Sequence, residues 1–336
     1  MNAAGTGSFG RLTVAATRPQ LAPFLFLEAA AARGVQGALL TVTTVLGGAP
    51  RPVGTHMAVL PGAQFAGYVS GGCIEPAIAA EVTPLLRSGQ DGILRFGAGS
   101  PFIDIRFPCG GGIEMLAHVR PTAQLVHEVL QRFGRREAFT LTFEPRANRS
   151  QISGTALPTG WDRDRFHRRY LPNTRLLLIG LGPDLAMMAR VAAAADFDVL
   201  VATPDVDTAA QMDDLGIPVR MLDSQVKDWA LPIDPWTATV LLFHQREWED
   251  RLLLTAVEGP GFYVGALGSV RTQRERLDRL ATQGVAPPLL RRIRGPIGLI
   301  TQARDPATLA LSVLAEISAT RKAIEHGSAP AEVGTA

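Results

Sequence analysis

The hydrophobic pattern of the first 134 residues indicates a mixture of helices and strands. An alanine-rich apolar stretch over 20–34 ends in glycine, which predicts a helix and its C-cap. Runs of β-branched and apolar residues over 38–46 and 56–69 flank a Gly/Pro-rich turn and predict two strands. The same criteria predict, in order, a helix over 73–89, strands within 92–100 and 102–121, and a helix over 122–134.

The pattern becomes more regular after residue 174, where short apolar runs alternate with helical stretches. The run 175–179 is followed by a glycine pair and a helical stretch that continues to Ala195. A final helix begins at Asp305, a suitable cap, followed by Pro306 in the first turn. Further strands are predicted over 198–202, 237–244 and 261–269. This alternation predicts a Rossmann-like, doubly wound and mainly parallel sheet.

These patterns predict an α/β protein with two domains. A small N-terminal α/β domain is expected over 1–134, and a Rossmann-like domain over 171–324. The stretch 135–170 is polar, arginine-rich and weakly periodic, so it is expected to be a connector carrying a strand or two. The last residues, 325–336, are expected to be a disordered tail.

Composition and charge exclude several classes of protein. The chain has 336 residues, 46% of them hydrophobic, and a formal charge of +2, which argues against binding to nucleic acid or to an anionic membrane. The longest stretch without acidic or basic residues, 52–74, is broken by prolines and glycines, so no membrane helix is expected. The N-terminus lacks the pattern of a secretory signal. We therefore expect a soluble cytoplasmic protein.

The glycine loop of the second domain has part of a dinucleotide-binding pattern. A strand, Gly180, Gly182 and then a helix would place backbone N–H groups near a diphosphate. However, Leu185 occupies the position of the third glycine, and Thr203 stands where an acidic residue would bind a ribose. Asp205, two positions later, could bind the ribose instead only if its loop turned back toward the end of the strand. The loop is therefore expected to contact a phosphate or nucleotide, with a plain chain turn as the alternative, and NAD(P) is disfavoured.

Two other features lie at the same predicted edge of the parallel sheet. His244 ends a strand where ligands bind α/β sheets, although a histidine bonded to a loop carbonyl is the alternative. Ser269 is expected to cap a helix with Arg271 in its first turn, and phosphate capture by both is the sharper alternative. A solvated helix face is expected for the other arginines of this segment, Arg274, Arg276 and Arg279.

Both cysteines of the chain stand beside glycines in the first domain. Cys73 follows a strand and precedes a predicted helix, where free N–H groups would favour a thiolate. Cys109 precedes a run of three glycines. The neighbouring glycines, which would keep the sulfur atoms reachable, are Gly71, Gly72, Gly110 and Gly111. The alternative is that these are buried cysteines at tight turns.

A structural zinc site is not expected from the cysteines, because two widely spaced cysteines lack the usual companion ligands. The spacing of His56 and His118 does not indicate that they are ligands beside the cysteines. Arg51 lies between two prolines in a turn, which makes it a fixed cation for a phosphate or an acidic partner, or else a plain surface arginine.

Several motifs together resemble the XdhC/CoxI family along nearly the whole chain. The motifs, in order, are PRPVGTHM, GYVSGGCIEPAI, FPCGGGIEML, YLPNTRLLLIGLGP, GFYVGALGSVRTQRERLDRL and GPIGLITQARDPATLALSVLAEI. The resemblance implies a chaperone that binds molybdenum cofactor, protects it and supports its sulfuration by a cysteine desulfurase. It also implies insertion into the large subunit of an enzyme such as xanthine dehydrogenase or aldehyde oxidoreductase. The chain looks similar to the subgroup that serves aldehyde oxidoreductases, and a homodimer is plausible for the family.

The resemblance implies that Cys73 and Cys109 are the cysteines of the cofactor site and bind the molybdenum of the cofactor. The neighbouring glycines would then shape the pocket. The cargo would be molybdopterin or its dinucleotide form, the latter placing a nucleotide near Gly182. Such a carrier has no catalytic residues. Two alternatives remain open: an NAD(P)-dependent oxidoreductase, and an enzyme that acts on the cofactor through a cysteine persulfide.

Overall fold

The computed structural model describes residues 19–48, 51–72, 74–98, 100, 110–223, 230–243 and 246–325, without the side chains of 246 and 247. Its described helices and strands belong to two compact units, one ending at Pro172 and the other beginning at Asn173. Cys73, Cys109 and His244 lie outside the described residues, as does the predicted tail beyond Glu325.

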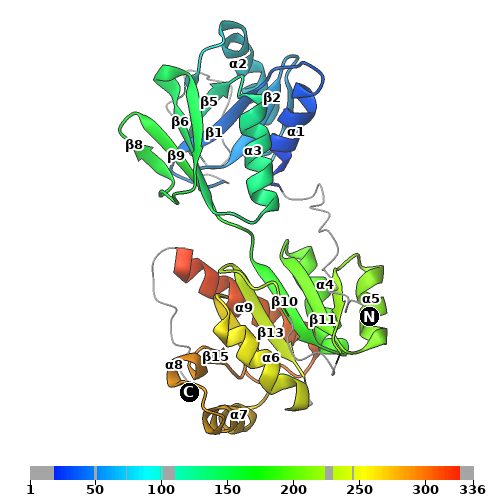
Figure 1. Cartoon of the computed structure of the whole chain (residues 1–336). Coiled ribbons are helices and arrows are strands. Elements are labelled where there is room, and N and C mark those ends of the chain that lie inside the picture. Colours follow the sequence, from blue (N-terminus) through cyan, green and yellow to red (C-terminus); the bar gives the residue numbers. More distant parts are fainter. Residues whose placement is uncertain are drawn as a thin grey trace, which may run out of the picture. The chain divides into compact units, whose positions relative to one another are not determined.

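The first unit contains an antiparallel sheet of five strands in the order β3-β2-β1-β5-β4. Figure 1 labels β1, β2 and β5 of this sheet. Its helices are α1 (Ala22–Ala31), α2 (Glu75–Ser88) and α3 (Ala123–Gly134). Its strands are β1 (Ala38–Leu46), β2 (His56–Leu60), β3 (Gln64–Ala66), β4 (Gly92–Gly97) and β5 (Gly112–Val119). The run predicted as one strand over 56–69 is therefore a hairpin of β2 and β3. Helix α2 ends as the sequence predicted, at a left-handed Gly89.

The stretch 135–170 differs from the predicted connector. It forms a second antiparallel sheet, ordered β7-β6-β9-β8, and a single 3-10 turn. The strands are β6 (Phe139–Glu144), β7 (Arg149–Ser153), β8 (Gly160–Asp162) and β9 (Arg165–Tyr170), and the turn is η1 (Pro145–Ala147). The aromatic side chains Phe139, Phe143 and Phe166 pack into one buried core with α1, α3 and the five-stranded sheet. The period-2 alternation in FTLTFE is the strand signal, but the arginine-rich surroundings obscured it.

The second unit contains a parallel sheet of six strands, and the alternating pattern had predicted a mainly parallel sheet here. The strand order is β12-β11-β10-β13-β14-β15. The strands are β10 (Arg175–Gly180), β11 (Asp198–Thr203), β12 (Val219–Met221), β13 (Thr237–Leu242), β14 (Tyr263–Ala266) and β15 (Ile293–Arg294). The helices are α4 (Pro183–Ala194), α5 (Val206–Asp214), α6 (Arg246–Glu258), α7 (Val270–Thr282), α8 (Pro287–Leu290) and α9 (Pro306–Glu325).

Apolar side chains cover both faces of this parallel sheet. Helices α4 and α9 contribute Leu185 and Val313 to the core on one face, whereas α6 and α7 contribute Leu253 and Leu280 on the other. The strand order reverses between β10 and β13, so the sheet has the switch point at which Rossmann-type folds bind ligands. Among the described helices, none combines the length and the apolar character needed to cross a membrane.

Candidate functional site

The strand registers bring the end of β1, the start of β5 and the end of β4 together at one end of the five-stranded sheet. Leu46 at the end of β1 pairs with Gly112 at the start of β5, and Gly112 also pairs with Gly97 at the end of β4. Ala66 at the end of β3 pairs with Ala58 in β2. All neighbouring strands of this sheet are antiparallel, so β1, β3 and β4 run in one direction and β2 and β5 run in the other. Ala58 pairs in turn with Leu39 near the start of β1, so β3 ends well before the row that holds Leu46, Gly112 and Gly97.

Three segments follow the strands that run in this direction, 47–55 after β1, 67–74 after β3 and 98–111 after β4, and we call them the cysteine-loop edge. Cys73 and Cys109 belong to two of these segments, although both lie outside the described residues. The candidate residues of the first unit that the structure describes all lie in these segments: Arg51, Gly71, Gly72, Gly110 and Gly111. Two of the three segments meet: a Cβ at Gly47 would lie 3.6 Å from the Gly111 Cα.

Glu75 organises the loop that precedes helix α2. Its side chain is fully buried, and one carboxylate oxygen accepts hydrogen bonds from the N–H groups of Val69 and Ser70, at 2.8 and 2.7 Å. The other oxygen accepts from the Ser70 hydroxyl at 2.7 Å and from the Gly72 N–H at 3.0 Å. The N–H groups of Gly71 and Ile74 complete the set at 3.3 and 3.2 Å. Burial acts to raise the pKa of Glu75, but these donors outweigh it and lower the pKa below its ordinary value.

This carboxylate changes how the loop can act on Cys73. The sequence suggested that free N–H groups at the start of α2 would favour a thiolate, but the described N–H groups around Cys73 already serve Glu75. Sequence reasoning assigned no role to Glu75. The signal was present in the SGGCIE motif, because a glutamate in the first helical turn after a Ser-Gly-Gly run can accept the N–H groups of that run.

The glycines of the two cysteine loops are of two kinds. Gly71, Gly72 and Gly110 are exposed, have φ angles of 109°, 108° and 69°, and have open space where a side chain would begin. Gly111 is buried, and a Cβ there would lie 2.1 Å from the Gly48 carbonyl oxygen. Gly111 thus permits a close backbone approach, whereas the other three leave room for a ligand.

The side chain of Arg168 supports the turn that carries Arg51. Arg168 on β9 donates from Nε to the Gly54 carbonyl at 2.8 Å, and its side chain fills the space beside Gly54. Arg51 itself is exposed, and no acceptor for its side chain is recorded among the described residues. This exposure fits both alternatives, a fixed cation for a ligand and a plain surface arginine.

His56 and His118 serve internal hydrogen bonds instead. The buried His56 ring lies between the hydroxyls of Thr41 and Tyr170, and burial followed by the Arg168 charge lowers its pKa to about 3. His118 contacts Asp91 and Ser150, both at 2.8 Å. Groups of three or more metal-ligating side chains are absent from the described parts of the chain.

The glycine loop of the second unit lies at the switch point of the parallel sheet. Gly180 ends β10, and a Cβ there would lie 2.4 Å from the Leu242 carbonyl oxygen on β13. Gly182 precedes α4 with a φ of 86° and open space around its Cα. Its N–H donates to the Thr208 hydroxyl at 3.2 Å. One N–H of this loop therefore has a partner within the protein.

The carboxylate that could have bound a ribose is used elsewhere. Asp205 caps α5, where its Oδ2 accepts from the N–H of Thr208 at 2.8 Å and from its hydroxyl at 2.6 Å. The end of β11 is occupied by the fully buried Thr203, whose hydroxyl accepts from the Asp205 N–H. The loop after β11 thus forms a helix cap and presents Thr203 where an NAD site has a carboxylate.

Ser269 and Arg271 have internal partners as well. Ser269 caps α7 by accepting from the Thr272 N–H at 3.1 Å, which confirms the capping role predicted for it. Arg271 is highly exposed and pairs with Glu275 one helical turn later, at 2.9 Å. These contacts are those of an ordinary solvated helix start, so they add no support for phosphate capture.

The solvated face predicted for the arginines of α7 is wrong for Arg276. Its side chain is buried and donates to Glu249 on α6, to Gln273 at 2.6 Å and to the Leu267 carbonyl at 2.7 Å. Arg279 makes a two-pronged contact with Asp250 on α6, at 2.7 and 2.6 Å. Arginine spacing alone does not distinguish a solvated face from an interhelical ion pair, because the acidic partners lie on another helix.

Fold and site together define a class: a two-unit α/β protein with a Rossmann-type sheet and two glycine-flanked cysteines that follow strands of a separate antiparallel sheet. Residues 176–317 match the family model described as the XdhC Rossmann domain, and residues 30–97 match that of the XdhC and CoxI family. The chain belongs to the XdhC/CoxI family.

Individual relatives agree with this assignment. The molybdenum cofactor insertion chaperone PaoD of Escherichia coli (strain K12) is 36% identical over 295 residues, which cover 88% of this chain and 86% of that protein. A probable xanthine dehydrogenase subunit of Bacillus subtilis (strain 168) is 25% identical over 327 residues, or 86% and 94% of the two chains. A crystal structure titled as a xanthine dehydrogenase from Bacillus halodurans has the same fold, with a TM-score of 0.70, 18% identity and coverage of 92% and 98%.

Proposed function

We propose that this protein is a chaperone that binds molybdenum cofactor, protects it and inserts it into a molybdenum hydroxylase of the xanthine dehydrogenase or aldehyde oxidoreductase type. The protein acts as a carrier without turnover. The observation that carries the proposal is the 36% identity to a molybdenum cofactor insertion chaperone over 88% of this chain. Both glycine-flanked cysteines of the chain follow strands of one five-stranded sheet, Cys73 after β3 and Cys109 after β4.

The residues at the cysteine-loop edge suit this cargo. Cys73 and Cys109 would supply soft sulfur ligands, which suit molybdenum and sulfur chemistry. The open space at Gly71, Gly72 and Gly110 would admit the pterin, and the guanidinium of Arg51 would bind its phosphate. Glu75 would hold the first cysteine loop in one conformation, so that the site is ordered before the cofactor arrives.

The proposal extends to partners and to the form of the cargo. A cysteine desulfurase would supply the sulfur for the terminal sulfido ligand, and the chaperone would work as a homodimer. The cargo would be molybdopterin or its cytosine or guanine dinucleotide. The glycine loop of the second unit would contact a phosphate through Gly180 and Gly182, since open space surrounds the Gly182 Cα. Gly182→Asp would then weaken binding of the dinucleotide form, and an unchanged affinity would count against this part.

A transfer assay tests the function. Protein loaded anaerobically is mixed with an apo-hydroxylase, and the activity gained is compared with that from free cofactor. We expect the wild type and an Arg33→Ala variant, altered at an exposed position in the turn after α1, to transfer efficiently. Cys73→Ala and Cys109→Ala should transfer poorly. Equal transfer by all four proteins, or no advantage over free cofactor, would overturn the proposal.

A further inference from the structure

The first unit contains a pocket of about 840 Å³ that the proposed function does not use. Three elements line it: the start of β4, the turn η1, and the hairpin that joins β8 to β9. The lining residues are Asp91, Gly92, Ile93, Pro145, Arg146, Trp161, Arg163 and Asp164. All of them belong to one compact unit.

This pocket lies away from the cysteine-loop edge. Gly92 at the start of β4 pairs with Ala117, whereas Gly97 at the end of β4 pairs with Gly112 at the cysteine-loop edge. The pocket is therefore at the opposite end of β4, and it shares no lining residue with the three segments of that edge.

Two apolar side chains offer surfaces for a flat ring. Trp161 is 41% exposed, and its indole contacts Phe166 edge-on, with ring centres 5.3 Å apart at 69°. This contact orients the indole. Ile93 on β4 is 49% exposed on another wall of the pocket. An exposed indole held in one orientation is a platform on which aromatic rings stack.

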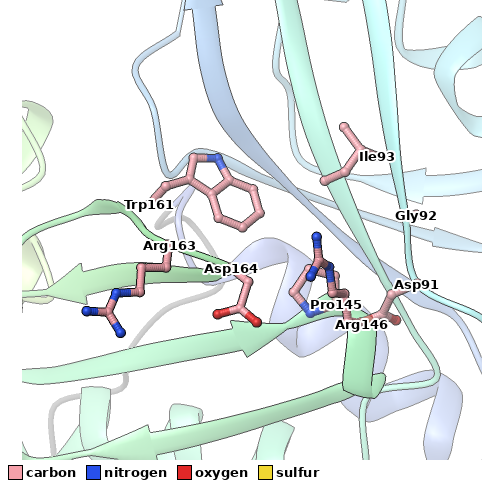
Figure 2. A pocket seen from close by; sticks show the side chains of 8 residues that line it. All are labelled: Asp91, Gly92, Ile93, Pro145, Arg146, Trp161, Arg163 and Asp164. Atoms are coloured by element: carbon pink, nitrogen blue, oxygen red, sulfur yellow. The ribbon is translucent and has the colours of Figure 1, made fainter.

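The charged groups of the pocket are available to a ligand. Arg146, Arg163 and Asp164 are exposed, and no hydrogen bond or ion pair of their side chains is recorded among the described residues. Figure 2 shows the Asp164 carboxylate and the Arg146 guanidinium facing the space beneath the Trp161 indole. Asp91, in contrast, is committed to His118 and to the N–H of Val119, each at 2.8 Å.

This combination fits a phosphorylated ligand with a flat ring that carries hydrogen-bond donors. A guanidinium binds phosphate, and a carboxylate accepts a pair of hydrogen bonds from a ring that presents adjacent N–H and NH₂ donors. Guanine and pterin both carry this 2-amino-4-oxopyrimidine edge, whereas adenine does not. We infer that the pocket binds a phosphorylated guanine or pterin, stacked on Trp161, with Asp164 reading the ring edge and Arg146 holding the phosphate.

Two sources could supply this chemistry: a guanine nucleotide, or the phosphorylated pterin of the cargo. Only the pterin source rests on the proposed function. Calorimetric titration of the full chain, purified from cells that cannot make molybdenum cofactor, would use GMP, AMP and a phosphorylated pterin. Binding of GMP alone would identify a nucleotide site, binding of the pterin alone would identify a second cargo site, and binding of both would confirm the shared chemistry. No detectable binding of GMP or of the pterin would overturn the inference.

Variants locate the binding. Trp161→Ala should weaken binding about 5- to 150-fold, the cost of losing one stacked ring, and Trp161→Phe should restore most of it. Arg146→Ala should weaken binding about tenfold or more. Asp164→Asn should reduce the preference for GMP over AMP. The Arg33→Ala control should bind normally, and circular dichroism should confirm that each variant is folded. Unchanged affinity in both Trp161→Ala and Arg146→Ala would place the ligand elsewhere and overturn the inference.

Discussion

At the scale of single residues, Glu75 illustrates how one buried side chain can determine the shape of a loop. Its carboxylate accepts hydrogen bonds from five backbone N–H groups and one hydroxyl, all within six positions of it. The Ser-Gly-Gly segment is thus wrapped around an anion that the protein itself supplies. The loop resembles the backbone nests that bind phosphate, with the anion built in.

Glu75→Gln should destabilise the protein by about 3 kcal/mol at neutral pH, because an amide NH₂ would face donors that now contact a carboxylate oxygen. The pKa of Glu75 is lowered on folding, so its contribution is present above the unfolded value of 4.5 and is lost as the pH falls through the lower folded value. Urea unfolding should therefore show the gap between variant and wild type closing in acid. Glu81→Gln on the same helix is the control, and an equal effect of both changes would contradict this account.

His56 provides a second pH-dependent contribution, of a different origin. Burial and the neighbouring Arg168 lower its pKa to about 3, so the folded protein keeps the ring neutral while the unfolded chain takes up a proton below 6.5. The stability that His56 contributes should therefore fall by roughly 1.4 kcal/mol per pH unit below 6.5. In His56→Gln this part of the pH dependence should vanish, so the unfolding free energies of the two proteins should converge between pH 7.5 and 5.5. Parallel pH profiles of the two unfolding free energies would contradict this contribution of His56.

At the scale of elements, the junction of β10 and β13 depends on a glycine for reasons of packing. Gly180→Ala would bring a Cβ to within 2.4 Å of a carbonyl oxygen on the neighbouring strand, at a φ of 152°. We expect a loss of about 3 kcal/mol in urea unfolding. Gly182→Ala has open space and meets only backbone strain at its φ of 86°, so it should cost about 1 to 2 kcal/mol. Equal losses would show that strand contact is not the cause.

Helices α6 and α7 are joined by a buried ion pair. Arg276→Met would leave the buried Glu249 with only Arg279, 3.6 Å away, so the protein should lose about 3 kcal/mol of unfolding free energy. Replacing both partners, in Arg276→Met/Glu249→Leu, should recover most of this loss. The exposed Arg274→Met should change stability by less than about 0.5 kcal/mol. A double variant no more stable than Arg276→Met would contradict the assignment.

At the scale of the whole molecule, the sequence predicts best where the pattern is local. The alternating strands and helices after residue 174 predicted the parallel sheet, and the glycine after α2 and the cap at Ser269 both lie where their local rules put them. The sheet formed by 139–170 was missed, since its alternation is short and its arginines dominate the composition.

The candidate site depends on contacts that no local pattern contains. The close approach of Gly111 to Gly48 follows from the pairing of β1 with β5, two strands that are distant along the chain. The burial of Arg276 depends on an acidic residue on another helix. The role of Glu75 was readable in principle, since its donors are neighbours in the sequence, but it required knowledge of how the loop turns.

The most direct test of the account is the pterin and molybdenum content of the protein purified anaerobically from cells that make molybdenum cofactor. The wild type should carry both, and the Cys73→Ala/Cys109→Ala double variant should have lost them while remaining folded. Equal content in the two proteins would contradict the assignment of the cargo to the cysteine-loop edge. A wild type without pterin, binding a nicotinamide nucleotide instead, would contradict the chaperone function itself.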